Sequence, residues 1–171
     1  MIERTHRIAT LLETVISFAL YSACEIYRYK LTRRWSDGPT LAFLMLNPST
    51  ATEAISDPTV ARCEERARRG GYGGLAVINL FALRSTDPKV LYTHPDPVGE
   101  HNDNAIVEVA KESEKLICAW GAHGKLLGRA ETIQKILRDA GIPLYALKLN
   151  KGKFPAHPLY LPYSLEPFKL G

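Results

Sequence analysis

Two asparagines in this chain each follow a run of apolar residues, and their side-chain amides could do chemistry. Asn47 follows the uninterrupted apolar run 41–46, and Asn79 follows the apolar segment 75–78. A primary amide both donates and accepts hydrogen bonds, so it can hold a water molecule or the polar edge of a ligand. Polar side chains at the carboxyl ends of central strands lie where open α/β sheets bind ligands. We therefore expect Asn47 and Asn79 to share one site.

Other residues in the loops after apolar segments could complete this site. His157 lies between Pro155 and Pro158 in a rigid loop, and it is the strongest general-acid or electrostatic candidate among the five histidines. Arg84, in the loop after Asn79, is the arginine best placed to bind a phosphate. The remaining residues expected at the site are Pro48, Ser49, Phe81, Trp120 and His123.

Each candidate also has a structural interpretation. Asn47 and Asn79 can terminate strands by bonding to local backbone. The core interpretation is favoured for Trp120, and His123 can instead cap the following helix or face solvent. Asp57 begins a helix near Asn47, where capping is its simplest role. We favour a functional role for the two asparagines because both end buried strands that are expected to be adjacent.

The elements that would position these residues follow from the alternation of apolar strands and helical segments. The buried strands expected are 41–46, 75–78, 115–120 and 143–147. Helices are expected between them, after the capping pattern at 56–59, after 101–104 and after 121–124. This alternation predicts a three-layer α/β/α sandwich with a four-stranded, mostly parallel sheet. Without a linker or repeat, we expect residues 1–171 to form one domain.

The first 35 residues add two further expectations. Residues 25–35 alternate basic with aromatic or apolar side chains, which predicts an N-terminal edge strand, with Arg28 and Lys30 on one face and Tyr29 on the other. A nucleic-acid-binding role for these basic and aromatic residues is the second interpretation. A short helix is expected at 8–16, where Thr10 and Glu13 resemble a capping pattern.

Composition limits the classes to which the protein can belong. The apolar fraction of 46% and charged fraction of 23% are ordinary for a globular protein, and 171 residues can bury one core. A net charge of +4 allows an acidic partner such as nucleic acid or a nucleotide. No signal peptide or membrane-length apolar run is present, so we expect a cytoplasmic protein without membrane contact. The three cysteines are expected to be reduced, and without paired His or Cys ligands we expect no metal or cofactor.

Several short motifs resemble one family found in bacteria and phages. They lie at 46–50 (LNPST), 57–59 (DPT), 71–74 (GYGG), 79–84 (NLFALR), 120–121 (WG) and 157–160 (HPLY). Together they closely resemble the family called domain of unknown function 1643, from about the expected edge strand to the tail. That family name implies no activity.

The order of four of these motifs also resembles the uracil-DNA glycosylase-like superfamily. Asn47 and Pro48 correspond to its Asx-Pro loop and Asn79 to the asparagine after its second strand. Trp120 and Gly121 correspond to the Trp-Gly element after its third strand, and His157 and Pro158 to its His-Pro loop. The resemblance implies that Asn47 orients water, Asn79 pairs with a flipped base, and His157 stabilises the departing base. An asparagine in the first motif can orient a water molecule but cannot act as a general base.

Three functions remain open from the sequence. The first is a base- or nucleotide-recognising protein that hydrolyses an N-glycosidic bond on nucleic acid. The second is a non-catalytic nucleic-acid-binding module that has kept the pocket, and the third is a hydrolase or transferase that acts on a free nucleoside or nucleotide. The sequence does not identify the base or the oligomeric state.

Overall fold

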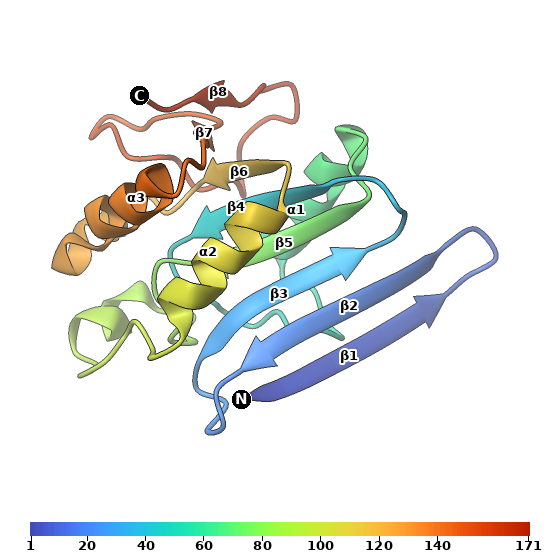
Figure 1. Ribbon diagram of the computed structural model, residues 1–171, viewed down its shortest axis with the longest axis horizontal. Helices are drawn as coiled ribbons and strands as arrows, with labels where there is room; N and C mark the ends of the chain where they lie inside the picture. The colour runs from blue at the N-terminus through green and yellow to red at the C-terminus, as the bar shows by residue number, and fades with distance from the viewer.

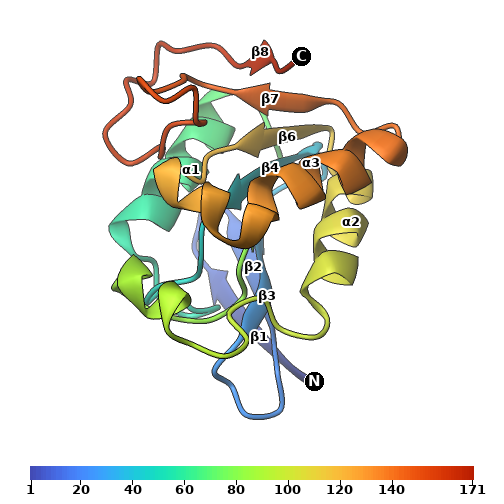
Figure 2. The ribbon, with the colours of Figure 1, turned by 90° about the vertical axis from the view of Figure 1, so that its left-hand side faces the viewer.

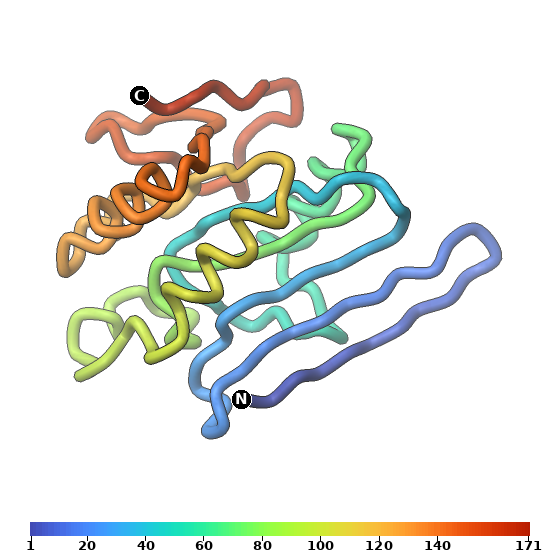
Figure 3. Tube along the Cα trace, in the orientation of Figure 1, coloured from blue at the N-terminus to red at the C-terminus, as the bar shows by residue number.

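The computed structural model describes residues 1–171, which form a mixed α/β fold with three α-helices on one eight-stranded sheet (Figure 1). The strand order across the sheet is β1-β2-β3-β5-β4-β6-β7-β8. The strands are β1 (Ile2–Ala9), β2 (Thr14–Tyr21), β3 (Arg28–Arg34), β4 (Thr40–Met45), β5 (Gly74–Asn79), β6 (Lys115–Cys118), β7 (Leu144–Ala146) and β8 (Phe168–Lys169). Figure 3 follows the chain from the β1–β2 hairpin at one end of the sheet to the tail beside β7 at the other.

The four strands expected from the apolar runs are neighbours in the centre of this sheet. β4 pairs in parallel with both β5 and β6, and β6 pairs in parallel with β7. All six residues of β5 are buried, as are 41–45 of β4, because helices cover both faces. The chain crosses from β4 to β5 on one side and then returns past β4 to β6. The carboxyl end of β4 is therefore the point at which the strand order reverses.

The helices divide between the two faces of the sheet. Val60, Cys63 and Ala67 of α1 (Pro58–Arg69) pack on one face, whereas α2 (Asn102–Glu112) and α3 (Arg129–Asp139) pack on the other. Figure 2 shows α1 and α2 on opposite sides of the sheet. Asp57 caps α1 by accepting a hydrogen bond from the Val60 backbone N–H (2.8 Å), which confirms the capping pattern. The two short 3₁₀ helices are η1 (Pro88–Tyr92) and η2 (Ala122–Gly128).

The prediction for the N-terminal region was wrong in two respects. Residues expected to form a helix at 8–16 belong to the antiparallel β1–β2 hairpin. The Thr10 hydroxyl accepts from the backbone N–H groups of Leu12 and Glu13, so the apparent helix cap instead stabilises the hairpin turn. The hairpin also covers β3, which pairs antiparallel with β2 and β5 and is therefore not an edge strand. The sheet has eight strands of mixed direction rather than four.

Candidate functional site

A pocket of about 320 Å³ lies at the carboxyl ends of β4, β5 and β6, and we call it the carboxyl-edge pocket. Its volume is at the lower end of the range for small-molecule sites. Among the residues expected from the sequence, those that line it are Asn47, Ser49, Asn79, Trp120, His123 and His157. Pro48, Phe81 and Arg84 do not line it. Loops far apart in the sequence thus contribute side chains to one concave site.

Asn79, the last residue of β5, has the least compensated side chain in this pocket. The residue is 1% exposed, and both its Nδ2 and its Oδ1 are buried without a hydrogen-bond partner. An unpaired buried polar group destabilises a protein by about 1–3 kcal/mol. Its backbone is held independently, because its carbonyl accepts from Nδ2 of Asn102 (2.9 Å). The fold therefore leaves the amide nitrogen free to donate to a ligand and the amide oxygen free to accept from it.

Asn47 has both a structural role and an open acceptor. Its Nδ2 donates to the carbonyls of Ser85 (2.9 Å), Pro48 (3.1 Å) and Leu83 (3.4 Å), and so joins the loops after β4 and β5. The Ser85 backbone N–H donates back to the Pro48 carbonyl (2.8 Å). No hydrogen bond forms to Oδ1 of Asn47. The fixed amide can therefore only accept from a ligand or a water molecule.

His157 is exposed and lies on the lining of the carboxyl-edge pocket. The Gly121 N–H donates to the Pro155 carbonyl (2.8 Å), which holds the histidine loop beside the end of β6. Shielding of part of the ring lowers the pKa of His157, while the nearby Asp57 carboxylate acts in the opposite direction. The Leu159 N–H donates to Nδ1 in a long bond (3.4 Å), so the proton of the neutral ring is on Nε2. The neutral form, which the lowered pKa favours, can therefore donate from Nε2–H.

Trp120 and His123 contribute differently to the lining. Trp120 is 3% exposed and belongs to the core cluster on the α2 and α3 face, which agrees with its core interpretation. A Cβ atom at Gly124 would lie 2.2 Å from the Trp120 ring, so only glycine fits against the indole here. His123 is exposed, and its Nδ1 is 2.9 Å from the hydroxyl of Tyr92. Trp120 therefore forms a fixed wall and His123 lies at the rim.

The expected residues outside the pocket are occupied elsewhere. Phe81 is fully buried in the core, and Pro48 is a buried residue of the loop after β4. Arg84 donates to the Glu25 carbonyl (3.3 Å) and lies over the Tyr21 ring. The expectation that Arg84 binds a phosphate in the site therefore has no support from the pocket geometry.

Sequence reasoning missed Arg28, which lines the carboxyl-edge pocket and is 2% exposed. Its Nη1 donates to the Ala51 carbonyl (2.5 Å), and no carboxylate lies within ion-pair distance. Burial lowers the pKa of Arg28 to about 10, and the nearby Asp57 acts in the opposite direction, so the group stays charged at pH 7. An isolated arginine in an alternating strand gave no signal of a buried position.

The pocket therefore combines a charged guanidinium, two amides that differ in their hydrogen bonds, two imidazoles and a carboxylate. Asp57 is the one carboxylate on its lining, and it uses Oδ1 for the helix cap. No three His, Cys, Asp or Glu side chains are grouped closely enough to hold a metal ion. None of the helices has the length and apolar character needed to cross a membrane.

Comparison with known proteins gives a family but no activity. A search of curated proteins found no match. A family model matches residues 28–159, a span that covers most of the chain and contains every residue lining the carboxyl-edge pocket. The chain therefore belongs to the family described as Protein of unknown function (DUF1643).

Proposed function

We propose that the carboxyl-edge pocket recognises a nucleobase through the side chain of Asn79. The observation that carries this proposal is the amide itself, which is almost fully buried and whose donor and acceptor both lack partners. A base edge presents adjacent acceptors and donors that one amide can match. The order of motifs shared with uracil-DNA glycosylase-like proteins supports the same role.

The same pocket has groups suited to hydrolysis of an N-glycosidic bond. A water molecule held by Oδ1 of Asn47 would attack the sugar carbon that bears the base, and the electron pair of the broken bond would leave on the base nitrogen. The Nε2–H of His157 would donate to the developing negative charge. Asp57 is the carboxylate available to accept the proton of the water, because Asn47 cannot.

The loops at this edge favour nucleic acid over a neutral partner. Exposed lysines occur in η1, in η2 and in the tail loop, the segments that contribute Pro88, His123 and His157 to the pocket. These lysines are Lys89, Lys125, Lys151 and Lys153. If they contact phosphates, affinity for a single strand falls steeply as salt is added, because counterions are released on binding.

A base-release assay over nucleosides and over DNA and RNA strands with modified and unmodified bases tests the proposed activity. His157→Ala should lower turnover by about 10²–10³, with a smaller effect on binding, because the interaction strengthens as charge develops. Asn79→Asp should change which base is preferred, since an acceptor replaces the amide donor. His6→Ala, in β1 outside the pocket, is the matched histidine control.

The result with the wild-type protein separates the three functions left open by the sequence. Release only from strands supports an activity on nucleic acid, and release only from free nucleosides supports a small-molecule hydrolase. Binding without release from any substrate would leave a recognition module and remove the hydrolytic mechanism.

A further inference from the structure

A β-bulge turns Arg28 toward the carboxyl-edge pocket. In the pairing of β2 with β3, Lys30 lies opposite Leu20 and Arg28 lies opposite Tyr21, so Tyr29 is an extra residue on β3. Regular alternation would place Arg28 and Lys30 on the same face. Instead, Lys30 pairs with Glu108 of α2, while Arg28 lies on the α1 face. Bulges commonly re-aim a side chain beside a functional site.

The guanidinium of Arg28 is less satisfied than those of the other buried arginines. Arg33 pairs with Glu64 and also donates to Ser56 and two carbonyls, and Arg129 pairs with Asp103 and the Leu80 carbonyl. Arg66 donates to a group of tail carbonyls. Arg28 makes one hydrogen bond, through Nη1. Its Nε is buried without a partner, as is Nε of Arg33, Arg62 and Arg66, but Nη2 donates in those three arginines and makes no hydrogen bond in Arg28. Nε and Nη2 together form the edge of the guanidinium that binds oxyanions side-on.

The charges around Arg28 leave this edge without a counter-ion. Asp57 is close enough to raise the pKa of Arg28, but one of its oxygens caps α1, and it forms no ion pair with Arg28. Arg84 and Arg33 add positive charge nearby. The phenol of Tyr21 is neutral, because burial raises its pKa to about 12, and it donates to Glu53 (2.8 Å).

The N-terminus of α1 lies at the same pocket and adds a second feature that favours negative charge. Asp57, Thr59 and Val60 at the start of this twelve-residue helix line the pocket. A helix N-terminus carries partial positive charge. Here the Asp57 carboxylate already accepts from the Val60 N–H and Pro58 has no N–H, so the Thr59 N–H is the amide left for a ligand. The unpartnered amide of Asn79, 1% exposed, lines the same space and indicates that a ligand enters it.

We infer that Arg28 binds a phosphate group of the ligand, so that the pocket takes a nucleotide rather than a bare base or nucleoside. This inference rests on the proposed base recognition by Asn79 and extends it to a second part of the ligand. The phosphate oxygens accept from the free edge of the guanidinium, while Asn79 contacts the base. Either a free nucleotide or a nucleotide within a strand can supply that phosphate.

Binding measurements without turnover test the inference. The probes are the common nucleosides, their 5′-monophosphates, short single strands and inorganic phosphate, each measured by calorimetry at one salt concentration. A wild-type protein should bind at least one monophosphate about 10- to 100-fold more tightly than its nucleoside. Arg28→Met should lose this gain, and Arg28→Lys should lose most of it because lysine has no planar fork.

The melting temperature distinguishes a binding role from a structural one. Arg28→Met removes a buried charge that has no counter-ion, so without ligand it should melt at or above the wild-type temperature. Arg66→Met removes a buried arginine that donates to the tail carbonyls. This variant should melt at a lower temperature than the wild type and still bind the monophosphate more tightly than the nucleoside. A strong loss of stability in Arg28→Met, with the phosphate gain retained in Arg28→Lys, would make Arg28 structural and overturn the inference.

The wild-type measurement alone can also overturn the inference, even if Arg28→Met fails to fold. Equal affinity for nucleosides and their monophosphates would mean that Arg28 does not bind the phosphate. Asn79→Ala separates this failure from failure of the proposed function. If discrimination among bases depends on Asn79 but monophosphates bind no more tightly than nucleosides, base recognition is supported and the phosphate site is excluded. If monophosphates bind more tightly than nucleosides but no base is preferred, the phosphate site is supported and base recognition by Asn79 is excluded.

Discussion

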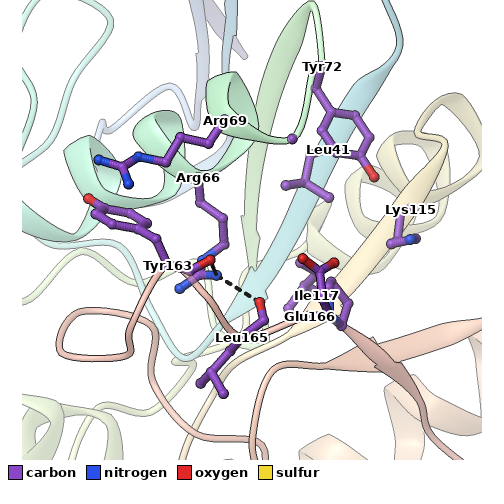
Figure 4. Close-up of a pocket in the computed structure, with 11 residues that line it drawn as sticks. Leu41, Arg66, Arg69, Tyr72, Lys115, Ile117, Tyr163, Leu165 and Glu166 are labelled. Atoms are coloured by element: carbon purple, nitrogen blue, oxygen red, sulfur yellow. Dashed lines mark hydrogen bonds between the residues drawn. The ribbon is translucent and has the colours of Figure 1, made fainter.

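Two pockets of similar size lie at opposite edges of the parallel strands, and they use arginine in opposite ways. The amino-edge pocket, about 300 Å³, is lined by Leu41 and Lys115 at the starts of their strands, by the end of α1 and by the C-terminal tail (Figure 4). There Arg66 donates to the carbonyls of Leu161, Pro162, Tyr163 and Leu165. In the carboxyl-edge pocket, Arg28 has one such bond.

The comparison supports the proposal that the carboxyl-edge pocket is the one that binds a ligand. In Figure 4, Arg66 and Arg69 approach the tail from α1, and Arg69 lies over the Tyr163 ring at 4.1 Å. These arginines attach the tail to the helix, so the fold accounts for their charges. The fold leaves Asn79 and the free edge of Arg28 unpaired, although nearly all buried polar groups in proteins have partners. Unpaired buried atoms also occur in Arg33, Arg62, Arg66 and Asn102, but each of these side chains donates to the fold through its other atoms, whereas the side chain of Asn79 makes no hydrogen bond at all.

Strand β4 connects the two edges, so a charge in its centre should abolish both pockets. Leu44 is fully buried, and Leu44→Asp should destabilise the protein by about 3–5 kcal/mol, because the carboxylate has no partner. Urea unfolding measures this change. Leu127→Asp, at a site that is 69% exposed, is the control and should change stability little. Near-wild-type unfolding of Leu44→Asp would exclude the central position of β4.

Removing the hydrogen bonds between Arg66 and the C-terminal tail should have the next largest effect on stability. Arg66→Met leaves several tail carbonyls without their charged donor, and we expect a loss of about 3 kcal/mol. Arg69→Met removes an exposed pair with Glu65 and the contact of Arg69 with the Tyr163 ring, but no hydrogen bond to the tail, and should cost about 1 kcal/mol. Thermal unfolding compares the two variants. Equal losses would contradict the structural role assigned to Arg66.

In the carboxyl-edge pocket, removing polar groups should instead stabilise the protein. Asn79→Leu replaces two unpaired buried atoms, and we expect a gain of about 1–2 kcal/mol together with loss of ligand binding. The matched control is Asn102→Leu, because that buried side chain donates to the carbonyls of Asn79 and Leu80. The control should lose about 2 kcal/mol. Destabilisation of both variants would mean that Asn79 serves the fold.

The smallest expected effect is a dependence of stability on pH through His157. Its pKa is lowered in the folded protein by partial burial, so the unfolded chain binds the proton more readily. Stability should therefore fall as pH drops through about 6.5 toward the folded pKa, and be regained above 6.5. Urea midpoints at pH 5.5 and 7.5 should differ less for His157→Gln than for the wild type. His6→Gln is the control, and an unchanged difference in His157→Gln would assign the dependence elsewhere.

Local patterns predicted the elements that lie near this site. Uninterrupted apolar runs identified the four central strands, since a strand covered on both faces cannot carry polar side chains. Asp57 and Pro58 predicted the start of α1 because capping needs only neighbouring backbone groups. Placing Asn47 and Asn79 in one site followed from the rule that parallel strands end at one edge, and His157 was expected to join them from the tail. Their chemical roles remain predictions.

Long-range pairing decided the features that local patterns could not predict. The Thr10 hydroxyl accepts from the N–H groups two and three residues later, as a helix cap would. A hairpin turn uses the same local bonds, so the sequence around Thr10 predicted a helix where the chain forms a hairpin. Covering β3 required β2 to pair with it, which the composition of β3 alone did not indicate.

The sequence by itself determined the central strands, the helices between them and the residue types at the strand ends, because hydrophobic periodicity and capping act over a few neighbouring residues. Tertiary structure decided which polar groups are left unpaired. The bulge at Tyr29 adds one residue to β3 and moves Arg28 to the other face of that strand. This bulge is defined only by the register between β2 and β3. The tail carbonyls that accept from Arg66, and the absence of any partner for the Asn79 side chain, likewise depend on segments brought together by folding. Whether a buried polar group supports the fold or awaits a ligand is therefore a property of packing.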